Sequence, residues 1–157
     1  MIDQDLFRAV LGRFASGITV ITTRDAAGVP HGMTVSAFSS LSLDPPLVLA
    51  CVAANATMRP VLDATDAFGV NILCDAQEAI SRRFAGPVDD RFGGIGYSEG
   101  RLGAPILDDV LAWLQCRIVA RHPAGDHVIL VGEVVDAGAR EGRPLLYYRG
   151  GYATLER

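Results

Sequence analysis

Lysine is absent from this 157-residue chain, and all fourteen of its basic residues are arginines. Chemistry that needs a lysine amine, such as Schiff-base formation, is therefore excluded. The arginines are scattered, the longest basic run is Arg82-Arg83, and the formal net charge is −4. Because nucleic-acid binding requires a clustered basic face, we expect no nucleic-acid partner.

Cysteine is also scarce, and its spacing matches no metal-binding or redox motif. Cys51, Cys74 and Cys116 each lie within an apolar run, which predicts three buried, reduced thiols and no metal site. No apolar run approaches the length of a membrane span. The first fourteen residues combine acidic side chains with helical periodicity, which is not typical of a signal peptide. We expect a soluble, cytoplasmic protein without a membrane partner.

Three common nucleotide-binding or catalytic motifs are missing. The chain has neither a G-x-G-x-x-G nor a Walker-type loop, so a Rossmann nucleotide site is not expected. It has no nucleophile elbow of the hydrolase kind. The acidic pairs Asp89-Asp90 and Asp108-Asp109 are typical of solvated loop or cap charges.

Short strand patterns outnumber helical ones along the chain. Alternating or continuous apolar runs rich in β-branched residues predict strands at 17–23, 31–38, 45–52, 68–74, 112–120, 127–137 and 144–152. Helical patterns cover 3–14, 56–65 and 75–86, while 87–105 is Gly-rich and predicts an ordered surface loop. The run 45–52 predicts a strand buried on both faces. Together these features favour one domain, residues 1–157, that is mainly β, an antiparallel barrel or closed sheet with peripheral helices.

The helix starts carry recognisable cap signals. Asp3 is a candidate N-cap for the first helix, whose apolar stripe consists of Leu6, Phe7, Val10, Leu11 and Phe14. Asp75 and Glu78 have capping-box spacing before the third helix, which Gly86-Pro87 should end.

The stretch from Gly32 to Met58 mixes many hydroxyl groups with an apolar run. A buried strand does not need Thr34, Ser36 and Ser40 so close together, and a surface loop does not need "LVLACV". Either the rest of the core or a ligand with many hydrogen-bonding edges could lie against it.

Thr57 is a candidate N-cap of the second helix, with Pro60 in its first turn. Free N–H groups, the hydroxyl and nearby Arg59 would suit a phosphate. An ordinary cap beside a surface arginine explains the same residues.

Histidines and tyrosines supply the other candidates. His127 follows a turn beside Asp126, and it is either a solvated loop residue or a positioned hydrogen-bond donor. His31, beside Pro30, is open to the same two interpretations. The C-terminal tyrosines Tyr147, Tyr148 and Tyr152 could pack in the core or stack on a ligand.

Six segments occur in order along the chain: "FASGITVITT", "GMTVSAFSSLSLDPPLVLACV", "NATM", "RFAG", "GDHVILVGEV" and "PLLYYRGGY". Together they give the chain a resemblance to the short-chain flavin reductases, the reductase components of two-component flavin-dependent monooxygenases. The resemblance covers about residues 7–152. It implies an FMN-binding split β-barrel with about three peripheral helices, usually a homodimer.

The resemblance also implies which residues bind the cofactor. It places the rim of the flavin ring against Thr34, Val35, Ser36, Ser40, Ala53 and Ala54, and the phosphate against Asn55 and Thr57. Phe84 would flank the cofactor, and Arg82 would pair with the phosphate. His127 matches a histidine on the nicotinamide side, and Tyr152 an aromatic residue near the same mouth. Ala37 departs from the family pattern, because relatives often have a hydroxyl there.

The implied activity is hydride transfer from NADH or NADPH to FMN or FAD, which supplies reduced flavin to a partner monooxygenase. His127 would orient the nicotinamide. Two alternatives stay open: a flavoprotein that retains its flavin and reduces ferric iron or a corrinoid, and a non-enzymatic module that binds flavin or haem.

Overall fold

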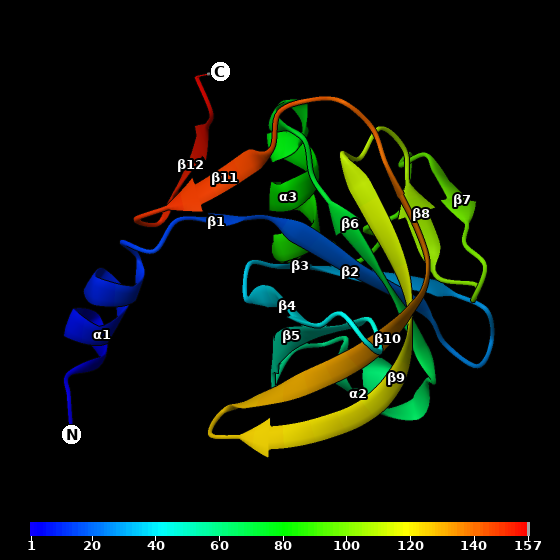
Figure 1. Cartoon of the computed structure of the whole chain (residues 1–157), viewed down its shortest axis with the longest axis horizontal. Coiled ribbons are helices and arrows are strands. Elements are labelled where there is room, and N and C mark those ends of the chain that lie inside the picture. Colours follow the sequence, from blue (N-terminus) through cyan, green and yellow to red (C-terminus); the bar gives the residue numbers. More distant parts are fainter. Residues whose placement is uncertain (157) are drawn as a thin grey trace.

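A curled antiparallel sheet forms the body of the computed structural model, which describes residues 1–156 (Figure 1). Its seven strands follow the order β3-β2-β6-β9-β10-β5-β4. They are β2 (Thr19–Arg24), β3 (Pro30–Val35), β4 (Phe38–Ser42), β5 (Leu47–Ala53), β6 (Ala67–Ile72), β9 (Ala112–Ala124) and β10 (His127–Ala139). Smaller sheets comprise β1 (Ser16–Gly17), β11 (Leu145–Tyr148) and β12 (Gly151–Thr154), and the pair β7 (Tyr97–Glu99) and β8 (Pro105–Leu107).

The two edge strands of the large sheet follow each other in sequence, so the sheet curls until its edges meet. β3 contacts β5, and the Cys51 N–H donates to the Ala37 carbonyl between β3 and β4 at 2.9 Å. The barrel therefore stays open along one seam, between β3 and the β4–β5 pair. The prediction of a mainly β split barrel with about three peripheral helices is confirmed.

Apolar residues from alternate strand positions fill the barrel. Val48, Ala50 and Val52 of β5 point inward and pack in one cluster with Phe68 and Leu130. A second cluster lies under the third helix and contains Ile18, Val20 and Phe84. Burial raises the pKa of the Cys116 thiol to about 12, so this side chain packs as a neutral apolar group.

The helices are α1 (Gln4–Leu11), α2 (Arg59–Ala64) and α3 (Glu78–Ala85), with a short 3₁₀ turn η1 (Asp75–Gln77) before α3. The Asp3 carboxylate accepts the Leu6 N–H at 3.3 Å, which confirms the predicted cap of α1. Gly86 ends α3, also as predicted. No helix within residues 1–156 is long and apolar enough to span a membrane.

Two predicted caps are wrong. α2 begins at Arg59 with Met58 as its N-cap, so the Thr57 hydroxyl caps nothing. Turn hydrogen bonds from Ala56 N–H to Ala53 and from Arg59 N–H to Ala56 occupy the preceding residues and delay the helix. At the third helix the reciprocal cap is formed by Cys74 and Gln77 before η1, not by Asp75 and Glu78.

Several strand boundaries also differ from the prediction. The 31–38 pattern divides between β3 and β4, and β9 continues to Ala124. Residues 87–105 include β7 and the first residue of β8.

β5 is buried on one face only, because Leu47, Leu49, Cys51 and Ala53 on its outer face are half-buried. Cys51 is therefore only partly buried, contrary to the prediction, whereas Cys74 and Cys116 are buried, and all three thiols are free.

α1 lies apart from the barrel in Figure 1. It is tied to the rest of the chain by the Arg149 N–H, which donates to the Gly12 carbonyl at 2.9 Å. Its predicted apolar stripe (Leu6, Phe7, Val10, Leu11 and Phe14) is 50–82% exposed. The stripe thus faces away from the core of its own chain.

Candidate functional site

A row of hydroxyl groups meets at the β3 side of the barrel seam. The Thr34 hydroxyl donates to the Ser81 carbonyl of α3 at 2.7 Å, and the Ser81 and Tyr152 hydroxyls are 2.8 Å apart. A cavity of about 200 Å³ opens here and is lined by Ile18, Thr34, Ser36, Ser81, Ala85, Tyr147 and Tyr152. We call it the Tyr152 pocket. It brings together three predicted site residues, Thr34, Ser36 and Tyr152, that are up to 118 positions apart in the sequence.

Arg82 covers one side of this pocket's aromatic wall. Its guanidinium carbon lies 4.8 Å from the centre of the Tyr152 ring, and its Nε donates to Glu78 at 3.3 Å. Tyr147 meets Tyr152 edge to face at 5.7 Å. Stacking and the hydrogen bond to Ser81 hold the Tyr152 ring in one orientation. Arg82 is largely exposed, so its cationic group remains accessible to an anion.

His127 lies at the other side of the seam, where β5 ends and β10 begins. It is the direct cross-strand neighbour of Ala53, and the Ala54 N–H donates to the Asp126 carbonyl at 2.8 Å. His127 Nδ1 is 2.7 Å from the Asp126 carboxylate. This hydrogen bond lowers the pKa of Asp126 below its ordinary value and fixes the ring, which leaves Nε2 directed away from the carboxylate. His127 is exposed, as a residue that meets a ligand must be.

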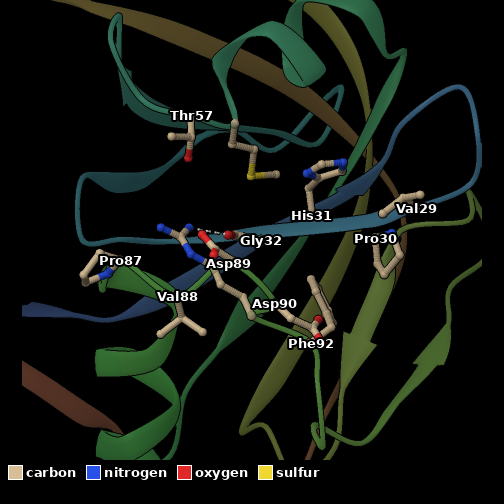
Figure 2. Close-up of a pocket in the computed structure, with 12 residues that line it drawn as sticks. Val29, Pro30, His31, Gly32, Thr57, Pro87, Val88, Asp89, Asp90 and Phe92 are labelled. Carbon is tan, nitrogen blue, oxygen red and sulfur yellow. Dashed lines mark hydrogen bonds between the residues drawn. The ribbon is translucent and has the colours of Figure 1, made fainter.

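A larger cavity of about 590 Å³ lies beside the first half of β3 (Figure 2). We call it the Thr57 pocket; its walls are Val29 to Gly32, Thr57 and Met58, and Pro87 to Phe92. In Figure 2 the Thr57 hydroxyl points into the cavity, opposite the 87–90 segment. β3 connects the two pockets, since residues 29–32 line this one and Thr34 lines the Tyr152 pocket. Gly32 and Thr34 are two residues apart, so at about 3.3 Å per residue the two pockets are separated by roughly 7 Å along the strand.

Arg91 is the cation of the Thr57 pocket, and the sequence did not reveal it. Its guanidinium donates to the carbonyls of Gly32 at 2.7 Å and Gly86 at 3.1 Å. It forms no ion pair with a carboxylate among the described residues. Its guanidinium therefore has no carboxylate partner among these residues, although Asp89 and Asp90 line the same cavity. Arg59, which we considered for this role, is instead held by Asp63 through its Nε at 2.9 Å. The only signal in the sequence was an arginine in the long 87–105 segment.

The other predicted site residues are placed as follows. Asn55 is exposed on the turn between Ala54 and Thr57, and Ser40 is exposed on β4 opposite Val48. Val35 packs inside the barrel, so it can meet a ligand only through its backbone. The Phe84 ring is fully buried in the core, where it packs against Phe92 at 5.0 Å. In this chain Phe84 supports the walls of the Thr57 pocket from behind and exposes no surface to a ligand.

Comparison with known proteins connects this geometry to one family. The sequence profile of the flavin reductase-like domain matches residues 11–156. The reductase subunit HsaB of a flavin-dependent monooxygenase from Rhodococcus jostii is 42% identical over 156 residues, which cover 99% of this chain and 80% of that protein. A longer curated relative from Rhizobium meliloti is 42% identical over 152 residues, or 97% of this chain, and the match spans 49% of that relative.

Solved structures agree with the sequence matches. The NADH:FAD oxidoreductase SgcE6 of Streptomyces globisporus C-1027, solved in complex with NAD and FAD fragments, superposes with a TM-score of 0.91 at 37% identity. That match covers 96% of this chain and 92% of SgcE6.

Proposed function

The chain belongs to the family of proteins with a flavin reductase-like domain. We propose that it transfers a hydride from NADH or NADPH to FMN or FAD, and we assign roles in this reaction to individual residues. The observation that carries the proposal is the placement of Thr34, Ser36 and Tyr152 on one side of the seam and His127 on the other.

The seam suits a flat ring with a polar rim. Ser36, Ala53 and Ala54 are small, so a ring can approach the backbone closely there. Thr34 directs its hydroxyl proton to Ser81, so towards a ligand this oxygen can only accept. Ser36 and Ser40 are exposed, and no side-chain hydrogen bond occupies them within residues 1–156, so they can donate or accept. These residues fit the edge of a flavin, whose rim presents both carbonyls and N–H groups.

His127 is the residue that we assign to the nicotinamide. When bound, the flavin supplies the acceptor for the hydride, and the protein contributes the geometry. Since Asp126 holds Nδ1 of the imidazole, Nε2 can bind the carboxamide of the nucleotide and hold its ring over the seam. Positioning of this kind accounts for a large part of the rate of a transfer between two stacked rings.

The partners of the reaction are proposals of the same kind. Relatives named as reductase subunits of flavin-dependent monooxygenases support a monooxygenase as the recipient of the reduced flavin. Three free thiols support a reducing, cytoplasmic location.

We further propose a homodimer, supported by two uncovered apolar surfaces. One is the stripe of α1, and the other is the outer face of β5. Monomeric proteins rarely expose a contiguous apolar patch of this kind. In a symmetric pair, each chain would cover these surfaces on the other.

The proposal for His127 is tested by His127→Ala. Flavin affinity should stay near the wild-type value, because the His127 side chain lines neither the Tyr152 nor the Thr57 pocket and, within residues 1–156, is hydrogen-bonded to Asp126 alone. The rate of hydride transfer measured by stopped flow should fall about a hundredfold, or the KM for the nucleotide should rise, because the near-attack geometry is lost. An unchanged transfer rate at every nucleotide concentration would show that His127 is only a solvated turn residue.

A protein that retains its flavin is the second candidate. Relatives named as NADH-dependent flavin reductases favour free flavin as the substrate. Stoichiometric flavin that survives gel filtration would instead identify a prosthetic group.

A further inference from the structure

We propose that the Thr57 pocket holds the adenosine half of FAD, so that this chain prefers FAD to FMN and His31 is the residue that discriminates between them. The inference rests on the proposed function, since it requires a flavin whose ring lies at the seam and whose phosphate lies near Thr57. It adds the identity of the flavin, which the seam residues do not determine.

The size of the pocket is the first argument. A phosphate group has five non-hydrogen atoms and displaces on the order of 150 Å³ of water, at about 30 Å³ per water molecule. The cavity holds about 590 Å³, so the phosphate of FMN would leave most of it filled with water. Cavities of this volume are typical of sites that enclose a whole organic ligand.

The pocket also has one end that suits a phosphate. Thr57 lies there with an exposed hydroxyl that caps no helix. Arg91, another wall residue, is bound only to the two backbone carbonyls of Gly32 and Gly86. A guanidinium without a carboxylate partner favours an anion beside it. The polar end therefore fits the phosphate bridge of a dinucleotide.

The opposite end is apolar and aromatic. In Figure 2, Val29, Pro30 and His31 stand at the far side of the cavity from Thr57, with Phe92 on the wall below. A purine is a flat ring that needs apolar contact on its faces and polar groups at its edge. A second anionic group does not fit at this end, because Asp90, two residues before Phe92, also lines the cavity. Carboxylates instead accept hydrogen bonds from ribose hydroxyls. A neutral nucleoside attached to the phosphate satisfies both ends.

His31 is held in position at this apolar end. Its Nε2 is 2.9 Å from the Asp25 carboxylate, which also accepts the Ala27 and Val29 N–H groups at 2.9 and 3.0 Å. The hydrogen bond from His31 is the main cause of the lowered pKa of Asp25. Asp25 thus fixes both the β2–β3 turn and the imidazole ring, so the ring forms a rigid wall on which a base can stack.

The test compares the dissociation constants of FAD, FMN and riboflavin, measured by quenching of flavin fluorescence or by calorimetry. Wild-type protein should bind FAD at least tenfold more tightly than FMN. His31→Ala should reduce that ratio towards one and leave the FMN and riboflavin constants unchanged. His122→Ala is the matched control: it removes an exposed imidazole outside the pocket and should leave the FAD/FMN ratio at the wild-type value. Retained FMN binding shows that His31→Ala is folded.

Adenosine 5′-monophosphate is a second probe of the same pocket. It should compete with FAD and leave riboflavin binding unchanged, because only FAD would occupy the apolar end.

Three results would overturn the inference. Equal affinities for FAD and FMN in wild-type protein would show that the pocket adds nothing to FAD binding. An equal loss of riboflavin affinity in His31→Ala would place the flavin ring, not the adenosine, in the pocket. If no flavin binds to wild-type protein, the proposed function itself fails, and this inference fails with it.

Discussion

Replacing Thr57 by valine isolates one hydroxyl group at the expected phosphate position. Thr57 is exposed, caps no helix, and makes no side-chain hydrogen bond within residues 1–156. Valine has nearly the same shape, so the free energy of unfolding should not change. The substitution should not disturb α2, because that helix begins two residues later.

The expected loss follows from the chemistry of one charge-assisted hydrogen bond. Removing the donor to a phosphate should cost about 1.5–3 kcal/mol, which corresponds to an increase of roughly 10- to 150-fold in the dissociation constant. FMN and FAD should both show this loss in a fluorescence titration. Riboflavin, which lacks the phosphate, should bind as before.

Thr154→Val serves as the control, since Thr154 is exposed on β12 and lines neither pocket. It should leave all three constants unchanged. A loss for riboflavin equal to that for FMN, or no loss for FMN, would refute the assignment of Thr57 to the phosphate.

Three further predictions follow from the fold and the site. In the monomeric protein at pH 8, Ellman's reagent should react with Cys51 well before Cys74 and Cys116, because Cys51 is partly exposed in a single chain and burial raises the pKa of Cys116 to about 12; rapid reaction of all three thiols would contradict the buried positions. His127→Ala should raise the pKa of Asp126 towards its ordinary value, because the hydrogen bond that favours the charged carboxylate is lost; a carboxyl titration by NMR that is unchanged would show that the two side chains do not interact. Val10→Glu should convert a dimer to a monomer in sedimentation velocity and preserve the circular dichroism spectrum, because Val10 is 54% exposed in its own chain; a dimer that persists would exclude α1 from the interface.

Local patterns in the sequence predicted the features that depend on neighbouring residues. The alternation of β-branched residues correctly indicated most of the strands, and Asp3 caps α1 because its bond spans only three positions. The continuous apolar run of β5 predicted burial on both faces, but its outer face is only half-buried in a single chain. A sequence pattern shows that a strand face is apolar, but it does not show whether the same chain or another one covers that face.

Contacts between distant segments were not predictable in this way. Arg91 owes its place to the Gly32 carbonyl, 59 positions away, and nothing near Arg91 in the sequence indicates that pairing. β9 was expected to stop at Ala120, with a turn over residues 121–126 that contains Pro123. Beyond Arg117, however, β9 pairs with β10 alone, so the proline lies on an open edge where its missing N–H costs no ladder hydrogen bond.

The most direct test of the central claim is steady-state oxidation of reduced nicotinamide by the purified chain, with NADH and NADPH each crossed with added FMN and FAD. The account predicts that oxidation depends on added flavin, that FAD supports it at lower concentration than FMN, and that His127→Ala slows it without weakening flavin binding. Absence of oxidation with every combination, by protein that binds flavin, would contradict the account and identify a flavin-binding module without reductase activity.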